Sequence, residues 1–347
     1  MPPRPAPSDP DVILPASHEI TKTLLAWTRV CRATAPLASK FLRQHCTHID
    51  SYKKLQSLVR CLGRSAHRVD QYGQPNVNTP TQMYLSPFLD DDYDTIPAPL
   101  NDLPTAKSVH DLFFLVAPTL RRLIVNMPLR SLYPDDDYDG IRPLLRKGFE
   151  ALVNIEEFVS LQDGLFLRLG PRSRNEPEVW ATCWPKLRRL SLYNVDIDPD
   201  RPLFSSMANV PHLESVIFPR LDGLSDWRVV DINGRNLGFS IDVKLEWLKA
   251  LVGRDIYPFG EPKRPQDISI MFVNTAQQEA SFSIHQDGWQ DMDPEGRIRV
   301  KLYDVDEYEY EKLNEIENVH EFLKQRALNG TLFDPELGKL VGRPRIV

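Results

Sequence analysis

The 347-residue sequence lacks the signatures of several common enzyme classes. It has no Gly-x-Ser-x-Gly elbow for a nucleophilic serine, no glycine-rich phosphate loop and no Gly-x-Gly-x-x-Gly dinucleotide motif. Glycine is scarce, at sixteen residues against thirty prolines, which indicates many stiff loop connections. We therefore expect a non-catalytic protein that takes no cofactor, and we keep a hydrolase or transferase of unusual α/β fold as a lesser alternative.

Cysteine and long apolar runs are also scarce. No two of the four cysteines form a Cys-x-x-Cys pair, which favours a reducing compartment over a disulfide scaffold. The strongest apolar run, residues 112–117, is far too short to span a membrane. The first ten residues hold five prolines and resemble neither a signal peptide nor an anchor. These features predict a cytoplasmic or nuclear protein without a membrane partner, and the net charge of −6 predicts no nucleic-acid partner.

The candidate metal motifs are incomplete. His18 and His320 each begin a His-Glu-x-x-His pattern, but a lysine replaces the second imidazole in both cases. The pentapeptide Asp-Asp-Asp-Tyr-Asp occurs at 90–94 and 135–139, and its second copy matches the first half of a calcium loop. Arginines stand where that loop needs an apolar residue and a final glutamate. We expect no metal site, and we interpret both acidic runs as solvated loops or docking sites for a basic partner.

A short phrase, apolar-x-x-apolar followed by an alternating strand pattern, recurs four times. Its copies begin at Leu120, Ile155, Leu187 and Leu213, separated by 35, 32 and 26 residues. Repetition at this spacing is typical of solenoids, whose single units cannot bury an apolar face alone. The central pairs read Arg-Arg, Glu-Glu, Arg-Arg and Glu-Ser. Parallel strands in sequence order would place opposite charges roughly 5 Å apart, so the alternation favours sequential pairing.

Apolar helical patterns precede these strands at 109–117, 141–152, 179–183 and 202–209. A repeated helix leading into a strand builds a parallel sheet with helices on its outer face. A fifth strand is expected at 268–273 after a helix at 245–252, with either Ile268 or Ile270 facing inward. Beyond it, the pattern predicts a strand at 298–303, an acidic run at 304–311 and an amphipathic helix over 310–328.

The alternation along each strand predicts which side chains face outward. Counted from the first apolar residue, the fourth and sixth positions, such as Leu190 and Leu192, should face the core. The third, fifth and seventh positions should lie on an open face, so reversing Glu157 to arginine should cost only about 1 kcal/mol. The alternating charges on that face either neutralise one another or form a partner-binding surface. The residues of such a surface would be Arg122, Ile124, Glu157, Val159, Arg189, Ser191, Tyr193 and Ile217.

The N-terminal helical region carries a second recognisable phrase. Residues 14–20 read Leu-Pro-Ala-Ser-His-Glu-Ile, residues 24–34 contain Val30-Cys31-Arg32, and Leu37-Ala38 follows. This region resembles the F-box, and with the repeats the chain is similar to fungal F-box proteins that carry irregular leucine-rich repeats. The spacing from Leu14 to Cys31 is shorter than in the family. Either the opening helix is missing, or Leu14-Pro15 forms the turn before the second helix, which we prefer.

The resemblance implies an α/β fold, a short irregular leucine-rich-repeat-like solenoid preceded by a small all-α module. The expected organisation is a disordered proline-rich tail (1–11), a truncated F-box-like helical module (12–63), a loop or linker (64–104) with at most one short ordered piece around 83–89, the solenoid (105–290), and a C-terminal strand, acidic run and helix (291–347).

The resemblance also implies a function, a substrate receptor of an SCF-type cullin–RING ubiquitin ligase that docks on a Skp-type adaptor. The short module weakens the expected adaptor contact. The alternative is a free-standing scaffold in which the module only caps the solenoid. The residues implied in adaptor binding are Leu14, Pro15, Ile20, Leu24, Leu25, Trp27, Val30 and Cys31.

Overall fold

The computed structural model describes residues 12–66, 79–88, 100–169, 176–195, 203–220, 240–252, 267–275, 283–284, 288–305 and 314–341. Within them the protein is an α/β structure built on a nine-stranded sheet whose strands lie in sequence order. All neighbouring strands are parallel except the last pair, which is antiparallel.

The sheet comprises β1 (His48–Ile49), β2 (Gln82–Leu85), β3 (Arg122–Val125), β4 (Glu157–Ser160), β5 (Arg189–Leu192), β6 (Ser215–Pro219), β8 (Ile268–Thr275), β10 (Ile298–Val305) and β11 (Lys339–Leu340). A separate parallel pair is formed by β7 (Ser240–Ile241) and β9 (Ser283–Ile284).

The helices in the described part of the chain are α1 (Glu19–Val30), α2 (Thr34–His45), α3 (Tyr52–Ala66), α4 (Leu103–Val116), α5 (Ile141–Glu150), α6 (Val179–Thr182), α7 (Leu203–Ala208), α8 (Val243–Val252), α9 (Trp289–Met292) and α10 (Glu315–Leu328). Two short 3₁₀ turns, η1 (Leu129–Ser131) and η2 (Pro134–Asp136), precede α5.

The recurring phrase forms the start of each central strand. In all four copies, two consecutive backbone N–H groups donate to one carbonyl, that of the residue just before the preceding strand. Glu156 and Glu157 donate to Arg121 O at 2.7 and 3.0 Å, and Arg188 and Arg189 donate to Glu156 O at 2.8 and 3.1 Å. This turn directs the second residue of each phrase toward solvent at the edge and the third onto the face of the sheet, while the first apolar residue is buried.

The expected pairing of the four repeats is confirmed. Arg122 pairs with Glu157, Glu157 with Arg189, and Arg189 with Ser215. The expected helix-facing side chains, including Leu123, Leu190 and Leu192, lie in a continuous apolar core.

This helix-side core lies between the sheet and the helices α3–α8. Its centre is aromatic, with the Phe113 and Phe149 rings 4.8 Å apart and the Phe158 and Trp184 rings 4.9 Å apart. The indole N–H of Trp184 donates to Phe149 O at 2.9 Å, so the ring is buried without losing its hydrogen bond. Ile268 and Ile270 both face this core, which settles the orientation of the fifth predicted strand.

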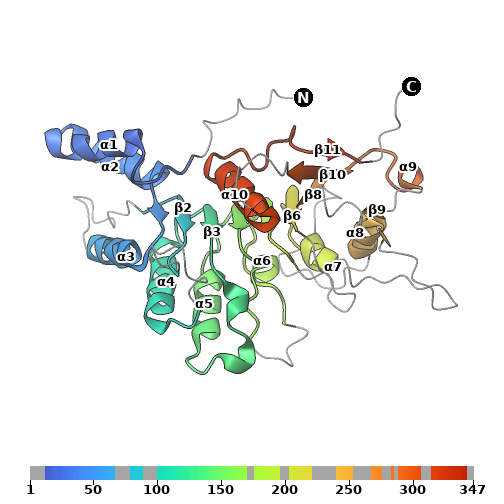
Figure 1. The fold of residues 1–347 in the computed structure, drawn as a ribbon, viewed down its shortest axis with the longest axis horizontal. Helices are drawn as coiled ribbons and strands as arrows, with labels where there is room; N and C mark the ends of the chain where they lie inside the picture. Colours follow the sequence, from blue (N-terminus) through green and yellow to red (C-terminus); the bar gives the residue numbers. More distant parts are fainter. Residues whose placement is uncertain are drawn as a thin grey trace.

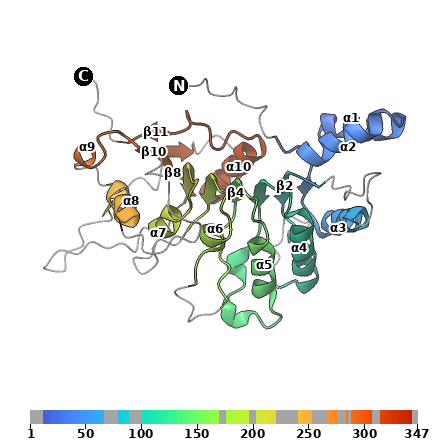
Figure 2. The same ribbon diagram turned by 180° about the vertical axis from the view of Figure 1, so that it is seen from behind.

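The other face of the sheet is not open, and this corrects the sequence expectation. A C-terminal arm, residues 314–341 with α10 and β11, lies across it, on the side opposite α4–α7 (Figures 1 and 2). Val319, Phe322 and Leu323 of α10 pack with strand residues such as Ile124 and Ile217 in a second, arm-side core.

Most of the expected partner-binding residues are therefore buried beneath the arm. The physical reason is that most of the face is apolar, and parallel sheets are normally covered on both sides. The buried members are Arg122, Ile124, Glu157, Val159, Ser191, Tyr193 and Ile217, whereas Arg189 remains partly exposed.

Within the presumed linker 64–104, the short ordered piece expected around 83–89 is β2, which pairs with both β1 and β3, and the segments 67–78 and 89–99 lie outside the described residues. Two other expected boundaries differ from the structure. The presumed module 12–63 is divided, because β1 joins the sheet and α3 packs against α4. The presumed separate region from 291 onward contributes β10, which pairs along its whole length with β8. The proline-rich tail 1–11 also lies outside the described residues.

Candidate interaction surfaces

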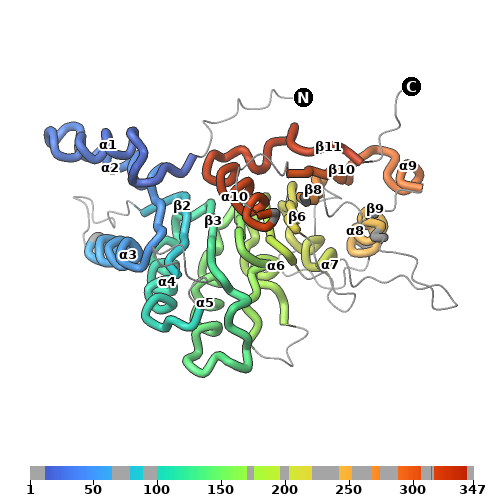
Figure 3. Tube along the Cα trace, in the orientation of Figure 1, coloured from blue at the N-terminus to red at the C-terminus, as the bar shows by residue number. Residues whose placement is uncertain are grey.

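The first candidate surface is the helical hairpin formed by α1 and α2, which extends from the β1 end of the sheet (Figure 3). His18 caps α1 by accepting the N–H of Ile20 at 3.2 Å. The hydroxyl of Thr34 closes the turn between the helices by donating to Trp27 O at 2.9 Å. At the base, Leu14 N donates to His45 O at 2.6 Å, which ties the hairpin to the segment leading into it.

Large apolar side chains cover the outside of this hairpin. Six of them expose between 42% and 70% of their surface, namely Ile20, Leu25, Trp27, Val30, Leu37 and Phe41. Monomeric proteins rarely gather so many on one small element unless a partner covers them. Of the residues that the family resemblance assigned to adaptor binding, Ile20, Leu25, Trp27, Val30 and Cys31 are exposed, while Leu14, Pro15 and Leu24 are half-buried. Phe41 was missed, because its helical spacing indicated only a core position.

The face that was expected to bind a partner holds a buried ionic cluster and is not accessible there to another protein. The two carboxylate oxygens of Glu157 accept from Arg122 Nε at 2.5 Å and from Arg189 Nε at 2.9 Å. The Arg122 guanidinium also donates to Gln82 Oε1 at 3.1 Å and to the carbonyl of Ala327 on the arm. One carboxylate thus serves two guanidiniums, and the cluster fastens α10 to the sheet.

A second polar group joins the arm to β2 and β3. His320 Nε2 and Asn126 Oδ1 are 3.2 Å apart, and the Asn126 amide donates to Ser86 Oγ at 3.2 Å. Burial, with Lys324 nearby, lowers the pKa of His320 to about 4. The imidazole is therefore neutral at neutral pH, and it acts as the donor to Asn126.

A buried carboxyl group lies on the loop after β4. Asp163 Oδ2 accepts from the Arg130 backbone N–H at 2.9 Å. Burial raises the pKa of Asp163 to about 6 despite this hydrogen bond. The following Leu165 has a φ of 56°, in the left-handed region that few non-glycine residues adopt. We interpret Asp163 as a group that shapes the loop rather than a catalytic acid.

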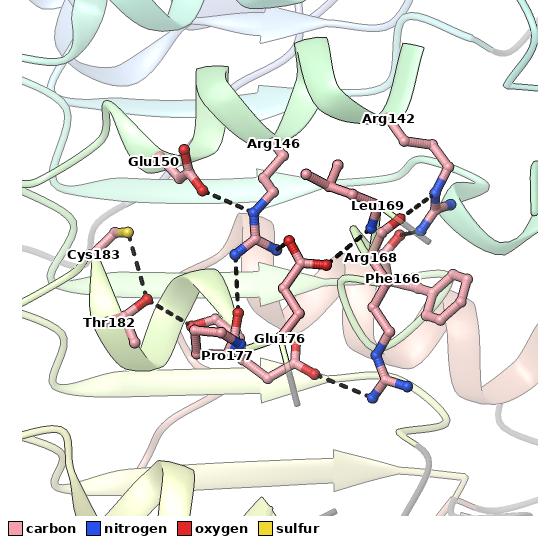
Figure 4. A network of polar contacts seen from close by, with 11 residues as sticks. Arg142, Arg146, Glu150, Phe166, Arg168, Leu169, Glu176, Pro177, Thr182 and Cys183 are labelled. Atoms are coloured by element: carbon pink, nitrogen blue, oxygen red, sulfur yellow. Dashed lines mark hydrogen bonds and ion pairs between the residues drawn. The ribbon is translucent and has the colours of Figure 1, made fainter. Parts of the chain in front are cut away.

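Two arginines of α5 hold the loops around it (Figure 4). Arg142 donates to the carbonyls of Phe166, Arg168, Leu129 and Leu132, at distances from 2.6 to 3.3 Å. Burial lowers the pKa of Arg142, although the nearby Asp137 opposes that effect.

Arg146 is the second of these arginines, and it binds Glu150 at 2.8 Å and Glu176 at 3.3 Å. Glu176 Oε2 also accepts from the backbone N–H of Leu169 at 3.0 Å, which joins the two sides of the segment 170–175, itself outside the described residues. The two arginines that exclude a calcium loop are therefore structural.

The second candidate surface is a charged groove along the strand starts of the sheet. Three adjoining cavities of about 570, 960 and 380 Å³ share lining residues from β3 to β10. The groove begins at the base of the hairpin, where Gln44 and His45 line it, and ends beneath residues 332–337 of the arm. Its rim carries the exposed second residues of the repeats, with Arg121 3.7 Å from Glu156 and Arg188 2.7 Å from Glu214.

The described residues contain neither a metal-binding cluster nor a membrane-spanning helix. No group of three histidine, cysteine, aspartate or glutamate side chains is placed there to hold a metal ion. Asp137, from the second acidic run, accepts the N–H groups of Ile141 and Arg142 at 2.7 and 2.8 Å and so begins α5. The first acidic run lies outside the described ranges. Of the helices in those ranges, none combines the length and apolar character needed to cross a membrane.

Comparison with known proteins adds no assignment. Neither a protein-family model, nor a curated protein, nor a solved structure matches the chain.

Proposed function

We propose that this protein is a non-catalytic interaction subunit whose α1–α2 hairpin docks on another protein. The observation that carries the proposal is the set of six large apolar side chains exposed on one hairpin. The hairpin's exposed Val30 and Leu37 lie on either side of its turn, away from the base that joins the sheet. Removing such side chains from water on binding would contribute about 25 cal/mol for each Å² of apolar surface covered.

The partner that best fits this surface is a Skp-type adaptor of a cullin–RING ubiquitin ligase. The support is the resemblance of residues 14–38 to the F-box, together with the exposure of Val30 and Cys31 within its Val-Cys-Arg phrase. On this proposal the α/β body is a short leucine-rich-repeat-like solenoid, and it presents a protein substrate to the ligase. An F-box has three helices, whereas the hairpin supplies two, α1 and α2. The apolar contact with the adaptor is then smaller, so we expect a complex that dissociates on dilution.

Co-expression of the full chain with a Skp-type adaptor, followed by size-exclusion chromatography, tests the adaptor assignment. We expect Val30→Asp and Leu37→Asp to abolish co-elution without loss of helical signal in circular dichroism. Phe114→Asp is the matched control, because Phe114 is equally exposed, at 54%, on α4 outside the hairpin. Co-elution of the hairpin variants at the level of the wild type would contradict docking through this surface.

A free-standing scaffold is the second candidate. The observation that favours it is that β1 and α3 complete one end of the sheet, as a terminal cap of a repeat protein would. In that case the wild-type chain would form no adaptor complex at any concentration, although the hairpin would still bind some other protein.

A further inference from the structure

One row of side chains crosses the sheet from β2 to β10, in register with the third position of the repeats. The paired residues are, in order, Gln82, Arg122, Glu157, Arg189, Ser215, Ser269 and Arg299. In the first half of this row Glu157 lies between two arginines and binds both. In the second half Arg189 and Arg299 flank two serines, with no carboxylate between them. The charge alternation is therefore incomplete over β6 and β8.

The 380 Å³ cavity of the groove opens at this gap. Ser215 and Ser269 line its floor together with the apolar side chains of Ile217 and Met271. Leu332, Phe333 and Leu337 of the arm form the opposite wall. Neutral hydroxyls beside apolar walls leave space for a ligand that carries both an apolar group and a hydrogen-bond acceptor.

Positive charge surrounds the cavity although the whole chain carries −6. Arg188, Arg189, Arg299 and Lys301 line it against only two carboxylates, Glu214 and Asp334. Glu214 is already bound by Arg188 at 2.7 and 3.0 Å. The oxygen Oδ1 of Asp334 accepts the N–H of Glu336 at 2.9 Å.

The two cations from β10 are the least compensated. Within the described ranges no carboxylate forms an ion pair with Arg299 or Lys301. Lys301 Nζ donates instead to the carbonyls of Leu337, at 3.0 Å, and Pro335. Partial burial, together with the charge of Arg299, lowers the pKa of Lys301, although Glu336 and Asp334 oppose that effect. An anion placed between Arg189, which already shares the Glu157 carboxylate, and Arg299 would be attracted by both guanidiniums and by Lys301.

We propose that this cavity binds an acidic, extended segment of a protein partner, with a carboxylate over Ser215 and Ser269 and a large apolar side chain against Phe333. The three strand steps from Arg189 to Arg299 span roughly 14 Å, enough for three or four residues of extended chain. The site is independent of the α1–α2 hairpin and of the adaptor assignment.

Fluorescence anisotropy with the full chain and a labelled eight-residue peptide tests the proposal. The peptide carries one phenylalanine between pairs of glutamates, and the matched peptide carries glutamines. We expect saturable binding of the glutamate peptide, at least tenfold weaker binding of the glutamine peptide, and weakening by added NaCl. Arg299→Gln and Lys301→Gln should each reduce affinity three- to tenfold, and Lys107→Gln, on the exposed surface of α4, should leave it unchanged.

A variant that supplies the missing carboxylate is the sharpest test. Ser215→Glu should pair with Arg189, raise the melting temperature and reduce peptide binding at least tenfold, so lost binding cannot be attributed to unfolding. The Val30→Asp hairpin variant should bind the peptide normally, which separates failure here from failure of adaptor docking. Equal binding of the two peptides, or binding by Ser215→Glu at wild-type affinity, would overturn the proposal. Tighter binding of a single-stranded oligonucleotide than of the peptide, with the same dependence on Arg299, would also overturn the proposal.

Discussion

The buried position of Glu157 leads to a prediction opposite to that from sequence alone. Only 4% of the Glu157 side chain and 5% of the Arg122 side chain are exposed, and they are joined at 2.5 Å. Replacing Glu157 by glutamine leaves the Arg122 guanidinium buried without a counter-charge. Breaking a buried ion pair in this way costs about 3–5 kcal/mol. We therefore expect Glu157→Gln to lower the free energy of unfolding by that amount, measured by urea denaturation at pH 7.

Two control variants isolate the cause. Arg189 contacts the same carboxylate, but 40% of its side chain is exposed, so Arg189→Gln should cost at most about 1 kcal/mol. The double variant Arg122→Met, Glu157→Leu removes both buried charges and should recover most of the loss, because apolar replacements of buried pairs are often neutral. A cost below about 1 kcal/mol for Glu157→Gln would refute the reasoning, since it would mean that the arm does not exclude water from this face.

Three further variants test the buried groups described above. The pKa of His320 is lowered to about 4, so its contribution to stability is complete above pH 6.5 and is lost as the pH falls to 4. His320→Gln should reduce by about 3 kcal/mol the loss of unfolding free energy between pH 6.5 and pH 4, measured by urea denaturation at several pH values. The pKa of Asp163 is raised to about 6, so its contribution is complete below pH 3.8 and is lost as the pH rises through 6. The free energy of unfolding of Asp163→Asn, relative to the wild type, should rise by about 3 kcal/mol between pH 4 and pH 8. An unchanged difference would show that the carboxyl group is solvated. Leu190→Ala should cost about 2–5 kcal/mol by opening a cavity in the helix-side core, and a silent variant would contradict its burial.

The repeats and the helix-side core could be predicted because their determinants are local. Each copy of the phrase carries its own buried apolar residue and its own charge, so the pairing of Arg122, Glu157 and Arg189 follows from neighbouring repeats. β1 has only two residues, too few for a strand pattern to appear. Its parallel pairing with β2 depends on residues more than thirty positions apart.

The arm-side core could not be assigned in the same way, because it joins segments about 200 residues apart. Ile124, Val159 and Ile217 gave a signal, since apolar side chains at alternate positions on an open face need a cover. The apolar spacing of Val319, Phe322 and Leu323 was visible as an amphipathic helix, but nothing local states which surface such a helix covers. The absence of a carboxylate between Arg189 and Arg299 depends on the register of β8 and β10. That register is seen in the folded sheet and could not be assigned from the sequence.

The arm-side core also sets an order of events during synthesis. Its covering residues come from segments that precede and follow the strands β1 to β10 in sequence, with Ile13 N donating to Leu328 O at 2.8 Å. While the ribosome makes residues 120–305, the strands can pair and the helix-side core can form, because each helix precedes its strand. The apolar row through Ile124, Val159 and Ile217 stays uncovered until α10 emerges, after every strand from β1 to β10 has been made. Nascent chains truncated before residue 315 should therefore expose a sheet face that invites aggregation or chaperone binding.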